Sequence, residues 1–205
     1  MAATPLAKRL LDLLVAGTLL VVLLPVIAIV LLSFALDVLF VPHDRGGLFY
    51  REPRISRGRT FGLLKFRTLK RAVLERAAGH VRPHEASREN LTWVGRRVLK
   101  PWYVDELPQL FNVLRGDISL VGPRPWPPHM VERQRAEGLT YRDEVTAGLT
   151  GPAQVSKGSG RRFADLDLVY VERIRTLSSW GVLCYDLEIL ARTVLVIARG
   201  QGLSY

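Results

Sequence analysis

An uncharged apolar stretch of 24 residues, Leu13 to Leu36, most constrains what this chain can fold into. Its length matches the roughly 20 apolar residues that cross a hydrocarbon core as a helix, so it predicts a membrane segment. A cleaved signal peptide is the first alternative. It fits poorly, because the apolar region of a signal peptide is usually only about 7–15 residues long.

Pro25 lies at the centre of this stretch, where it removes a backbone hydrogen bond and kinks a helix. Each half then spans only about 16–18 Å, which is short of a hydrocarbon core of ~30 Å. Positive residues also flank both ends, Lys8 and Arg9 before and Arg45 after, and this favours keeping both ends on the cytoplasmic side. A re-entrant hairpin bent at Pro25 satisfies both conditions, and a kinked spanning helix is the alternative.

The charge of the chain indicates an anionic partner. The formal net charge is +10, and residues 45–100 hold 15 Lys or Arg against 4 Asp or Glu. Such a belt favours phosphates, nucleic acid or an acidic membrane face. The mean hydropathy of +0.14 is higher than a soluble nucleic-acid binder of this charge usually has.

The remaining residues predict a mostly helical α+β fold with a small β-hairpin. Short β-compatible pieces separated by glycine and proline run from Phe49 to Leu69, and the polar stretch from Val73 to Glu89 is expected to be a mobile loop that bears a helical turn. Apolar residues at helical spacing predict two amphipathic helices, over 166–177 and 183–197, suited to a core or to a membrane interface. We expect a membrane hairpin over 1–40 and one continuous catalytic domain over 41–205.

Asp105 and Glu106 are the first candidate reactive residues. Pro108 can be helical only within a first turn, so the sequence VDELPQLFNVL predicts a helix that begins near Asp105. The positive end of the helix dipole would keep this carboxylate ionised, as a metal ligand or nucleophile requires. The alternative is that Asp105 only caps the helix and Glu106 is a first-turn acid.

Arg124 is the second candidate. It lies between Pro123 and Pro125 in the sequence GDISLVGPRPWPP, whose prolines stiffen the loop. A guanidinium fixed in this way suits bidentate binding of a phosphate, and an arginine on a rigid surface turn is the alternative.

Four segments in this order, KFRT, DELPQL, GDISLVGPRP and GLTGPAQV, resemble the bacterial sugar transferases, also called small monotopic phosphoglycosyl transferases. The resemblance covers nearly the whole chain. It implies transfer of a phosphosugar from a UDP-sugar to a polyprenyl phosphate such as undecaprenyl phosphate, with release of UMP and with Mg²⁺ as cofactor. It also implies a bacterial inner-membrane protein on the cytoplasmic face, acting in the first membrane step of glycoconjugate or exopolysaccharide synthesis.

The resemblance also implies roles for individual residues. Asp105 would be the nucleophile of an aspartyl-phosphosugar intermediate and would lie at the Mg²⁺, with Glu106 as its catalytic partner. The proline-flanked Arg124 would hold the nucleotide, and Pro25 would be the membrane kink. Lys65 and Arg67 of KFRT, together with Lys100, are further expected substrate-binding residues.

The chain departs from the family pattern at Leu24, Pro101 and Pro152, and Lys100 alone keeps a positive charge where members have two arginines. A rival interpretation is a membrane-tethered basic module that binds nucleic acid or anionic lipid. That interpretation leaves Asp105, Glu106 and Arg124 without a role, so we expect no nucleic-acid partner. Membrane lipid is an expected partner, and self-association of the chain is left open.

Overall fold

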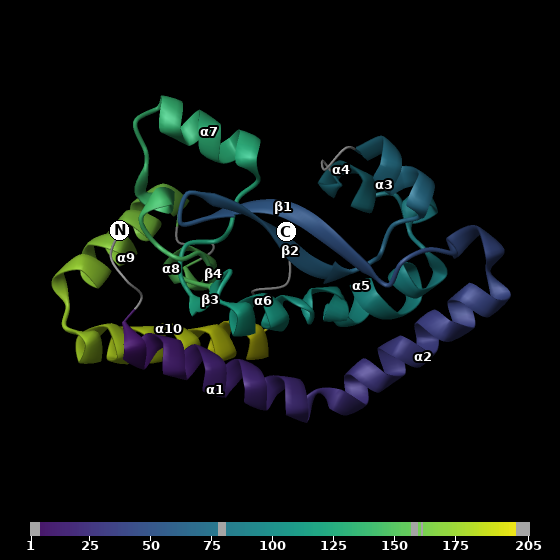
Figure 1. Cartoon of the computed structure of the whole chain (residues 1–205), viewed down its shortest axis with the longest axis horizontal. Coiled ribbons are helices and arrows are strands. Elements are labelled where there is room, and N and C mark those ends of the chain that lie inside the picture. The colour runs from purple at the N-terminus through teal and green to yellow at the C-terminus, as the bar shows by residue number, and fades with distance from the viewer. Residues whose placement is uncertain (1–4, 78–80, 157–159, 161, 200–205) are drawn as a thin grey trace. The chain divides into compact units, whose positions relative to one another are not determined.

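The structure is a computed structural model that describes residues 5–77, 81–156, 160 and 162–199 (Figure 1). The chain forms two compact units. The first comprises Met1–Gly17, Pro53–Phe61 and Asn112–Tyr205, and the second comprises Thr18–Glu52 and Gly62–Phe111. The long helix α1 (Leu6–Val22), the two hairpin strands and helix α6 (Gln109–Arg115) each pass from one unit into the other.

The first unit is built on a short parallel sheet of β3 (Ser119–Val121) and β4 (Gly148–Thr150), in which Ser119 pairs with Gly148. Gly148 is needed at this position because a Cβ there would lie 2.1 Å from the Gly122 nitrogen. The remaining helices of the unit are α7 (Pro128–Ala136), η5 (Tyr141–Asp143), α8 (Pro152–Val155), α9 (Phe163–Thr176) and α10 (Ser179–Ala198).

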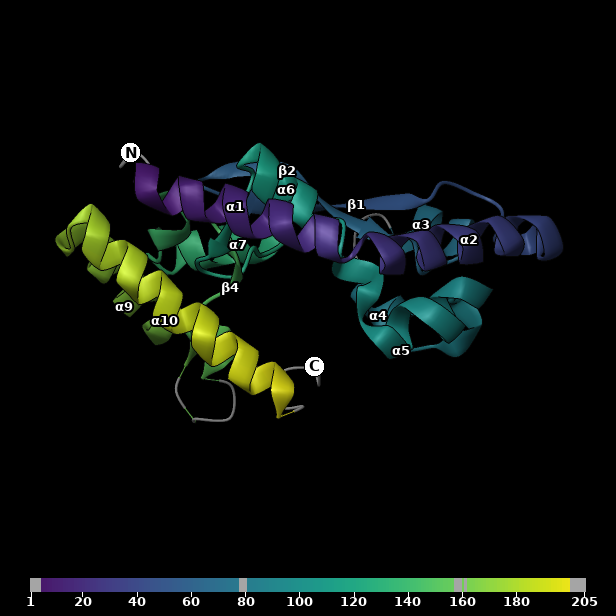
Figure 2. The same ribbon diagram turned by 90° about the horizontal axis from the view of Figure 1, so that it is seen from below.

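A buried polar network fastens the start of α1 to this unit. Lys8 Nζ lies 2.6 Å from Asp186 Oδ2 and donates to the Val121 carbonyl at 2.8 Å. Asp12 accepts hydrogen bonds from the Ser119 hydroxyl and the Leu120 amide, both at 2.9 Å. The first turns of α1 therefore lie beside α10 and β3 (Figures 1 and 2).

The second unit packs around the inner face of α2 (Leu24–Phe40). Val30 and Phe34 of α2 form a buried cluster with Phe66, Val94 and Leu99. The elements of this unit are η1 (Pro42–Asp44), α3 (Arg71–Ala77), α4 (Arg82–Glu85), η2 (Arg88–Asn90), the π-helix η3 (Gly95–Leu99), α5 (Lys100–Trp102) and η4 (Val104–Glu106). The two-stranded sheet of β1 (Phe49–Ser56) and β2 (Arg59–Phe66) has its base here and its tip in the first unit.

The apolar stretch is bent where the sequence predicts it. Helix α1 ends at Val22 and α2 begins at Leu24, and the chain bends at this break (Figure 1). The angle between the two helices is 58°. Pro25 lies in the first turn of α2, where its missing N–H breaks no helical hydrogen bond. Within the described residues no single helix is long and apolar enough to cross a membrane, whereas this bent pair meets the length and composition together.

The predicted hairpin and the two amphipathic helices are confirmed by β1, β2, α9 and α10. The stretch from Val73 to Glu89 was expected to be a loop with one helical turn, and it holds more helix than that, in α3 and α4, while residues 78–80 lie outside the described part of the chain. Val73 and Ala77 are buried against Leu69, and this packing gives α3 a stability that its polar sequence does not indicate. The parallel pair β3 and β4 was not predicted, because three-residue strands leave no periodic pattern to detect.

Candidate active site

Asp105 and Glu106 lie in a short 3-10 turn in the second unit, η4. Val104 and Leu107, on either side of them, pack against the buried cluster of α2. Tyr103, immediately before the turn, adopts the left-handed conformation with φ of 52°. This conformation costs a non-glycine residue about 1 kcal/mol, and residues held in it cluster at functional sites. The acidic pair is therefore held in place by packing on both sides.

Asp105 is buried and paired with a lysine. Only 4% of the residue is exposed, and Lys100 Nζ lies 3.0 Å from its Oδ2 atom. The same ammonium group lies 3.0 Å from Oε2 of Glu85, on α4. Lys100 therefore links Asp105 to a second carboxylate.

Burial raises the pKa of the Asp105 carboxyl above its usual range, and the neighbouring Lys100 opposes this rise. Burial also lowers the pKa of Lys100, but its two carboxylate partners outweigh that effect and raise it. Lys100 therefore stays protonated, and its charge favours the ionised form of Asp105. An ionised carboxylate that has lost most of its hydration is a suitable nucleophile.

Glu106 has its own cationic partner. Lys65 Nζ, from β2, lies 3.4 Å from Glu106 Oε1 and 3.3 Å from Oε2 of the buried Glu52. The structure thus brings four predicted site residues together in the second unit: Asp105, Glu106, Lys65 and Lys100. Glu52 and Glu85 were missed, because their link to the site is made by tertiary contacts and not by a local motif.

The predicted helix start is wrong. Helix α6 begins at Gln109, so Asp105 neither lies in its first turn nor caps it. The 3-10 turn ends at Glu106, and Pro108 immediately precedes the helix. The helix dipole therefore does not lower the pKa of Asp105, and the pKa is raised by burial instead.

Arg67 makes internal hydrogen bonds. It is 3% exposed and donates to the carbonyl oxygens of Asp44, Gly47 and Leu69 at 2.5, 2.7 and 3.1 Å. These bonds join the end of β2 to the segment that follows α2. The substrate site proposed below therefore contains Lys65 and Lys100 but not Arg67.

Arg124 lies in the first unit, in a loop whose backbone is held along its length. The carbonyl oxygens of four successive residues, Pro123 to Trp126, each accept a hydrogen bond from elsewhere in this unit, with donors on Gly148, Arg142, Arg54 and Ile55. Arg124 is half-buried. The loop is therefore stiffened by hydrogen bonds as well as by Pro123 and Pro125.

Arg142 is the main brace of this loop, and this role was not predicted from the sequence. It is 5% exposed, donates to the Arg124 carbonyl at 2.5 Å and pairs with Asp167 at 2.8 Å. Its guanidinium carbon also lies 4.2 Å from the ring centre of Trp126. Nothing in its sequence neighbourhood distinguishes it from an exposed arginine.

The described residues contain no group of three or more His, Cys, Asp or Glu placed to hold a metal ion. The residues present fit Mg²⁺ in another way, because protein sites for this ion often supply only one or two carboxylates while substrate phosphates complete the coordination. Asp105, followed directly by Glu106, offers such a donor set.

Residues 3–200 match the model of a family described as bacterial sugar transferase. The chain belongs to the bacterial sugar transferase family. The undecaprenyl-phosphate glucose phosphotransferase of Komagataeibacter xylinus is similar to this family member, with 33% identity over 200 residues that cover 92% of this chain and 35% of the relative. The UDP-glucose:undecaprenyl-phosphate glucose-1-phosphate transferase of Caulobacter vibrioides is 34% identical over 205 residues, which cover 94% of this chain and 70% of that relative.

An uncharacterized sugar transferase of Bacillus subtilis, EpsL, is 37% identical to this family member over 209 residues, covering 96% of this chain and 90% of that relative. The chain spans little more than a third of the length of the Komagataeibacter relative. These matches confirm the family resemblance inferred from the four sequence motifs.

Proposed function

We propose that this sugar transferase moves a phosphosugar from a UDP-sugar to a polyprenyl phosphate such as undecaprenyl phosphate and releases UMP. This would be the first membrane step in making a glycoconjugate or exopolysaccharide. The observation that carries the proposal is the buried Asp105 with a protonated Lys100 at 3.0 Å. The printed names of the Komagataeibacter and Caulobacter relatives support the substrate classes.

In the first step a carboxylate oxygen of Asp105 forms a bond to the phosphorus that carries the sugar. The bond from that phosphorus to the oxygen bridging the two phosphates breaks, and UMP leaves with the bridging oxygen and its electron pair. The product on the protein is an aspartyl-phosphosugar. Splitting the transfer into two displacements lets each substrate react separately with a fixed nucleophile.

In the second step a phosphate oxygen of the polyprenyl phosphate attacks the same phosphorus. The bond to Asp105 breaks, the carboxylate is regenerated, and the polyprenyl diphosphate sugar leaves. Lys100 stabilises the carboxylate in its free state and so helps it to leave. Glu106, held by Lys65, would orient Asp105 or accept a proton from the incoming phosphate.

Positive charge near the reacting phosphates supplies the main electrostatic stabilisation. Lys65 and Lys100 offer ammonium groups beside the acidic pair. Arg124, on its rigid loop, is the proposed ligand of the nucleotide phosphates or uridine. When bound, Mg²⁺ would neutralise charge on the diphosphate, and Asp105 with Glu106 would hold it.

The contacts of the bent helix pair support a re-entrant placement in the inner membrane, with the rest of the chain on the cytoplasmic face. Lys8, Asp12 and Ala16 of α1 are buried, and so are Val30 and Phe34 of α2. The start of α1 therefore packs within the first unit and α2 packs within the second, and positive residues at both flanks favour keeping both ends on the cytoplasmic side. Lys8 and Arg9 were expected as a flanking charge cluster, but their bonds to Asp186 and to the carbonyls of Val113 and Leu114 give them a structural part in this anchoring.

The rival interpretation, a basic module that binds nucleic acid or anionic lipid, accounts for the charge alone. It gives no reason to bury an aspartate beside a strained turn and to pair it with a lysine. Burying an ionisable group costs stability, and here the buried pair adjoins Tyr103, whose strained backbone is of a kind that clusters at functional sites.

Release of UMP tests the proposal directly. The full chain in lipid nanodiscs is mixed with a panel of UDP-sugars, with and without polyprenyl phosphate and Mg²⁺. We expect UMP in proportion to lipid-linked product from at least one UDP-sugar, and no turnover with Asp105→Asn. If no UDP-sugar of the panel yields UMP and the chain binds nucleic acid tightly, the result supports the rival interpretation of a basic binding module.

A further inference from the structure

The first unit contains a polar cavity whose lining residues are not among the candidate active-site residues described above. It has a volume of about 480 Å³, which lies within the range of small-molecule sites. Its walls come from the tip of the β1–β2 hairpin and from the start of the GDISLVG segment: Ser56, Arg57, Arg59, Thr60, Phe61, Gly116 and Asp117. We call it the hairpin-tip cavity.

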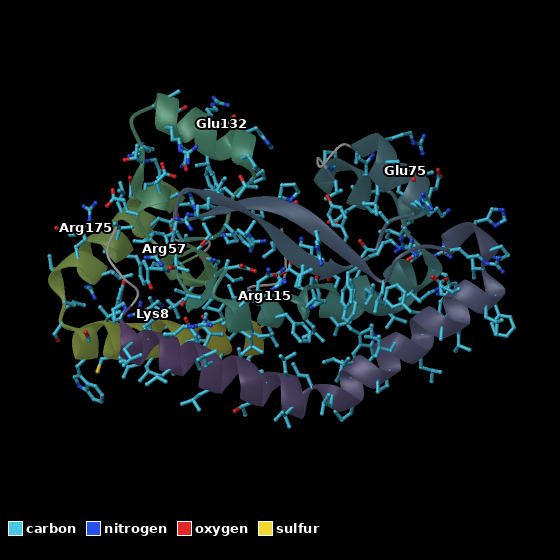
Figure 3. The ribbon with its side chains drawn as sticks, in the orientation of Figure 1. Lys8, Arg57, Glu75, Arg115, Glu132 and Arg175 are labelled. Atoms are coloured by element: carbon cyan, nitrogen blue, oxygen red, sulfur yellow. The ribbon has the colours of Figure 1, made fainter. Side chains whose placement is uncertain are left out.

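The charged groups around this cavity leave it positive. Arg57 and Arg59 line it, and its one carboxylate, Asp117, has Arg115 within 3.5 Å. Arg57 and Arg115 are labelled in Figure 3. Asp143, which touches the hairpin turn at Gly58, is already paired with Arg135 through two hydrogen bonds. The neighbouring acids therefore have arginine partners, and the two cavity arginines favour a doubly negative ligand.

Arg57 is held in an unfavourable backbone conformation. Its φ is 51°, and Arg57 and Tyr103 are the non-glycine residues with positive φ in the described part of the chain. Asparagine or glycine would fit the first position of this tight turn better than arginine. Tyr103 adjoins the acidic turn, and Arg57 faces a cavity. A strained residue at each place is consistent with a selected function for the Arg57 side chain.

The turn that carries Arg57 is also fixed in position. The Arg57 amide donates to the Val145 carbonyl at 3.3 Å, and the Ser56 hydroxyl accepts from the Ala147 amide at 3.1 Å. Arg59 and Phe61 are two residues apart on β2 and so lie on the same face of the strand. A guanidinium and an aromatic ring are thus placed side by side on a docked hairpin.

We propose that the hairpin-tip cavity binds the phosphate group of a small phosphorylated molecule, through Arg57 and Arg59. A nucleotide and a sugar phosphate share this chemistry, and both are of a size that the cavity holds. Phe61 would favour the nucleotide, because an aromatic ring stacks on a base. The proposal is independent of the role assigned to Asp105.

Hydrogen–deuterium exchange of the full chain in nanodiscs measures whether a ligand protects the backbone amides that surround the cavity. Separate samples receive UMP, a hexose 1-phosphate or inorganic phosphate, and protection is followed in peptides covering 55–61 and 115–118. We expect protection there with at least one phosphate monoester. Greater protection by UMP supports recognition of the base, and equal protection by all three supports recognition of phosphate alone. No protection with any of them overturns the proposal.

Arg57→Asn removes the guanidinium and suits the turn, so it leaves the fold intact. We expect it to weaken the local protection so that about tenfold more ligand is needed, and Arg59→Gln to do the same. Arg133→Gln, at a highly exposed arginine of the same unit, is the matched control and should bind as the unchanged chain does. Unchanged protection in both cavity variants would refute the assignment. Asp105→Asn should keep the protection, and this separates failure here from failure of the proposed reaction.

Discussion

Lys100 Nζ lies 3.0 Å from Asp105 Oδ2 and 3.0 Å from Glu85 Oε2, so one ammonium group is shared by the proposed nucleophile and a carboxylate from α4. The lysine opposes the rise in the pKa of Asp105 that burial causes. The pH dependence of the activity should therefore shift when Lys100 is lost, and shift little or in the opposite direction when Glu85 is lost.

Lys100→Gln removes the charge that favours ionised Asp105, so the pKa of Asp105 should rise further. The reaction needs the carboxylate, and the acidic limb of the pH profile of kcat/KM should move to higher pH. Glu85→Gln leaves Lys100 with one carboxylate partner, and its limb should stay in place or move to lower pH. If the unchanged chain, Lys100→Gln and Glu85→Gln have the same acidic limb, the ionisation of Asp105 does not set the pH dependence of the activity.

Arg124 and Arg142 should respond differently to the same conservative change. Arg124→Lys keeps the charge but loses the planar fork, so we expect kcat/KM for the UDP-sugar to fall at least about tenfold at an unchanged melting temperature. Arg142→Lys loses the bonds to Arg124 and Asp167, so both activity and melting temperature should fall. If Arg124→Lys leaves turnover unchanged, Arg124 does not bind the substrate and is only part of a rigid surface turn.

The buried pair of Lys8 and Asp186 should matter for stability. Lys8→Met leaves an uncompensated buried carboxylate, and we expect a loss of about 3–5 kcal/mol in the free energy of unfolding. Lys8→Met combined with Asp186→Leu should recover much of it, because the second change removes the orphaned charge. Denaturant titration in detergent measures both, and additive losses in the double variant would show that the two side chains are not coupled.

The re-entrant placement predicts that both flanks of the bent helix pair lie on one side of the membrane. Single cysteines are placed at Thr4, which lies outside the described residues, and at Arg45, after Cys184→Ser removes the natural thiol. In intact cells both should be shielded from an impermeant thiol reagent. Labelling at Thr4 alone would support a spanning helix. Pro25→Ala should shift some molecules towards that topology, because it restores a helical N–H at the break.

Sequence patterns predicted those parts of the fold that follow from local regularity. The apolar stretch and Pro25 predicted a bent helix pair, and the spacing of apolar residues predicted α9 and α10. The start of α6 was predicted wrongly, because Pro108 is compatible both with a first helical turn and with the residue just before a helix. The pKa of Asp105 was predicted in the wrong direction for the same reason, because the helix-dipole argument needs a helix that begins at Asp105. The observed rise comes from burial, which depends on packing that the local sequence does not specify.

The candidate site was predictable only where motifs carry it. DELPQL and GDISLVGPRP made Asp105, Glu106 and Arg124 candidates, first through the prolines beside them and then through the family resemblance. Glu52 and Glu85 join the acidic pair of the second unit, and Arg142 braces the Arg124 loop of the first unit. All three do so through contacts between segments distant in sequence. Arg67 belongs to a motif, but its buried hydrogen bonds show how a motif residue can serve the fold.

The central claim is that Asp105 becomes covalently attached to the phosphosugar. The most direct measurement is intact-protein mass spectrometry after mixing the full chain with a UDP-sugar and Mg²⁺ but no polyprenyl phosphate. The account predicts a mass increase equal to one phosphosugar that hydroxylamine removes, that polyprenyl phosphate chases into product, and that is absent from Asp105→Ala. The same adduct on Asp105→Ala, or product that forms only when UDP-sugar and lipid are bound together with no adduct at any time, would contradict it.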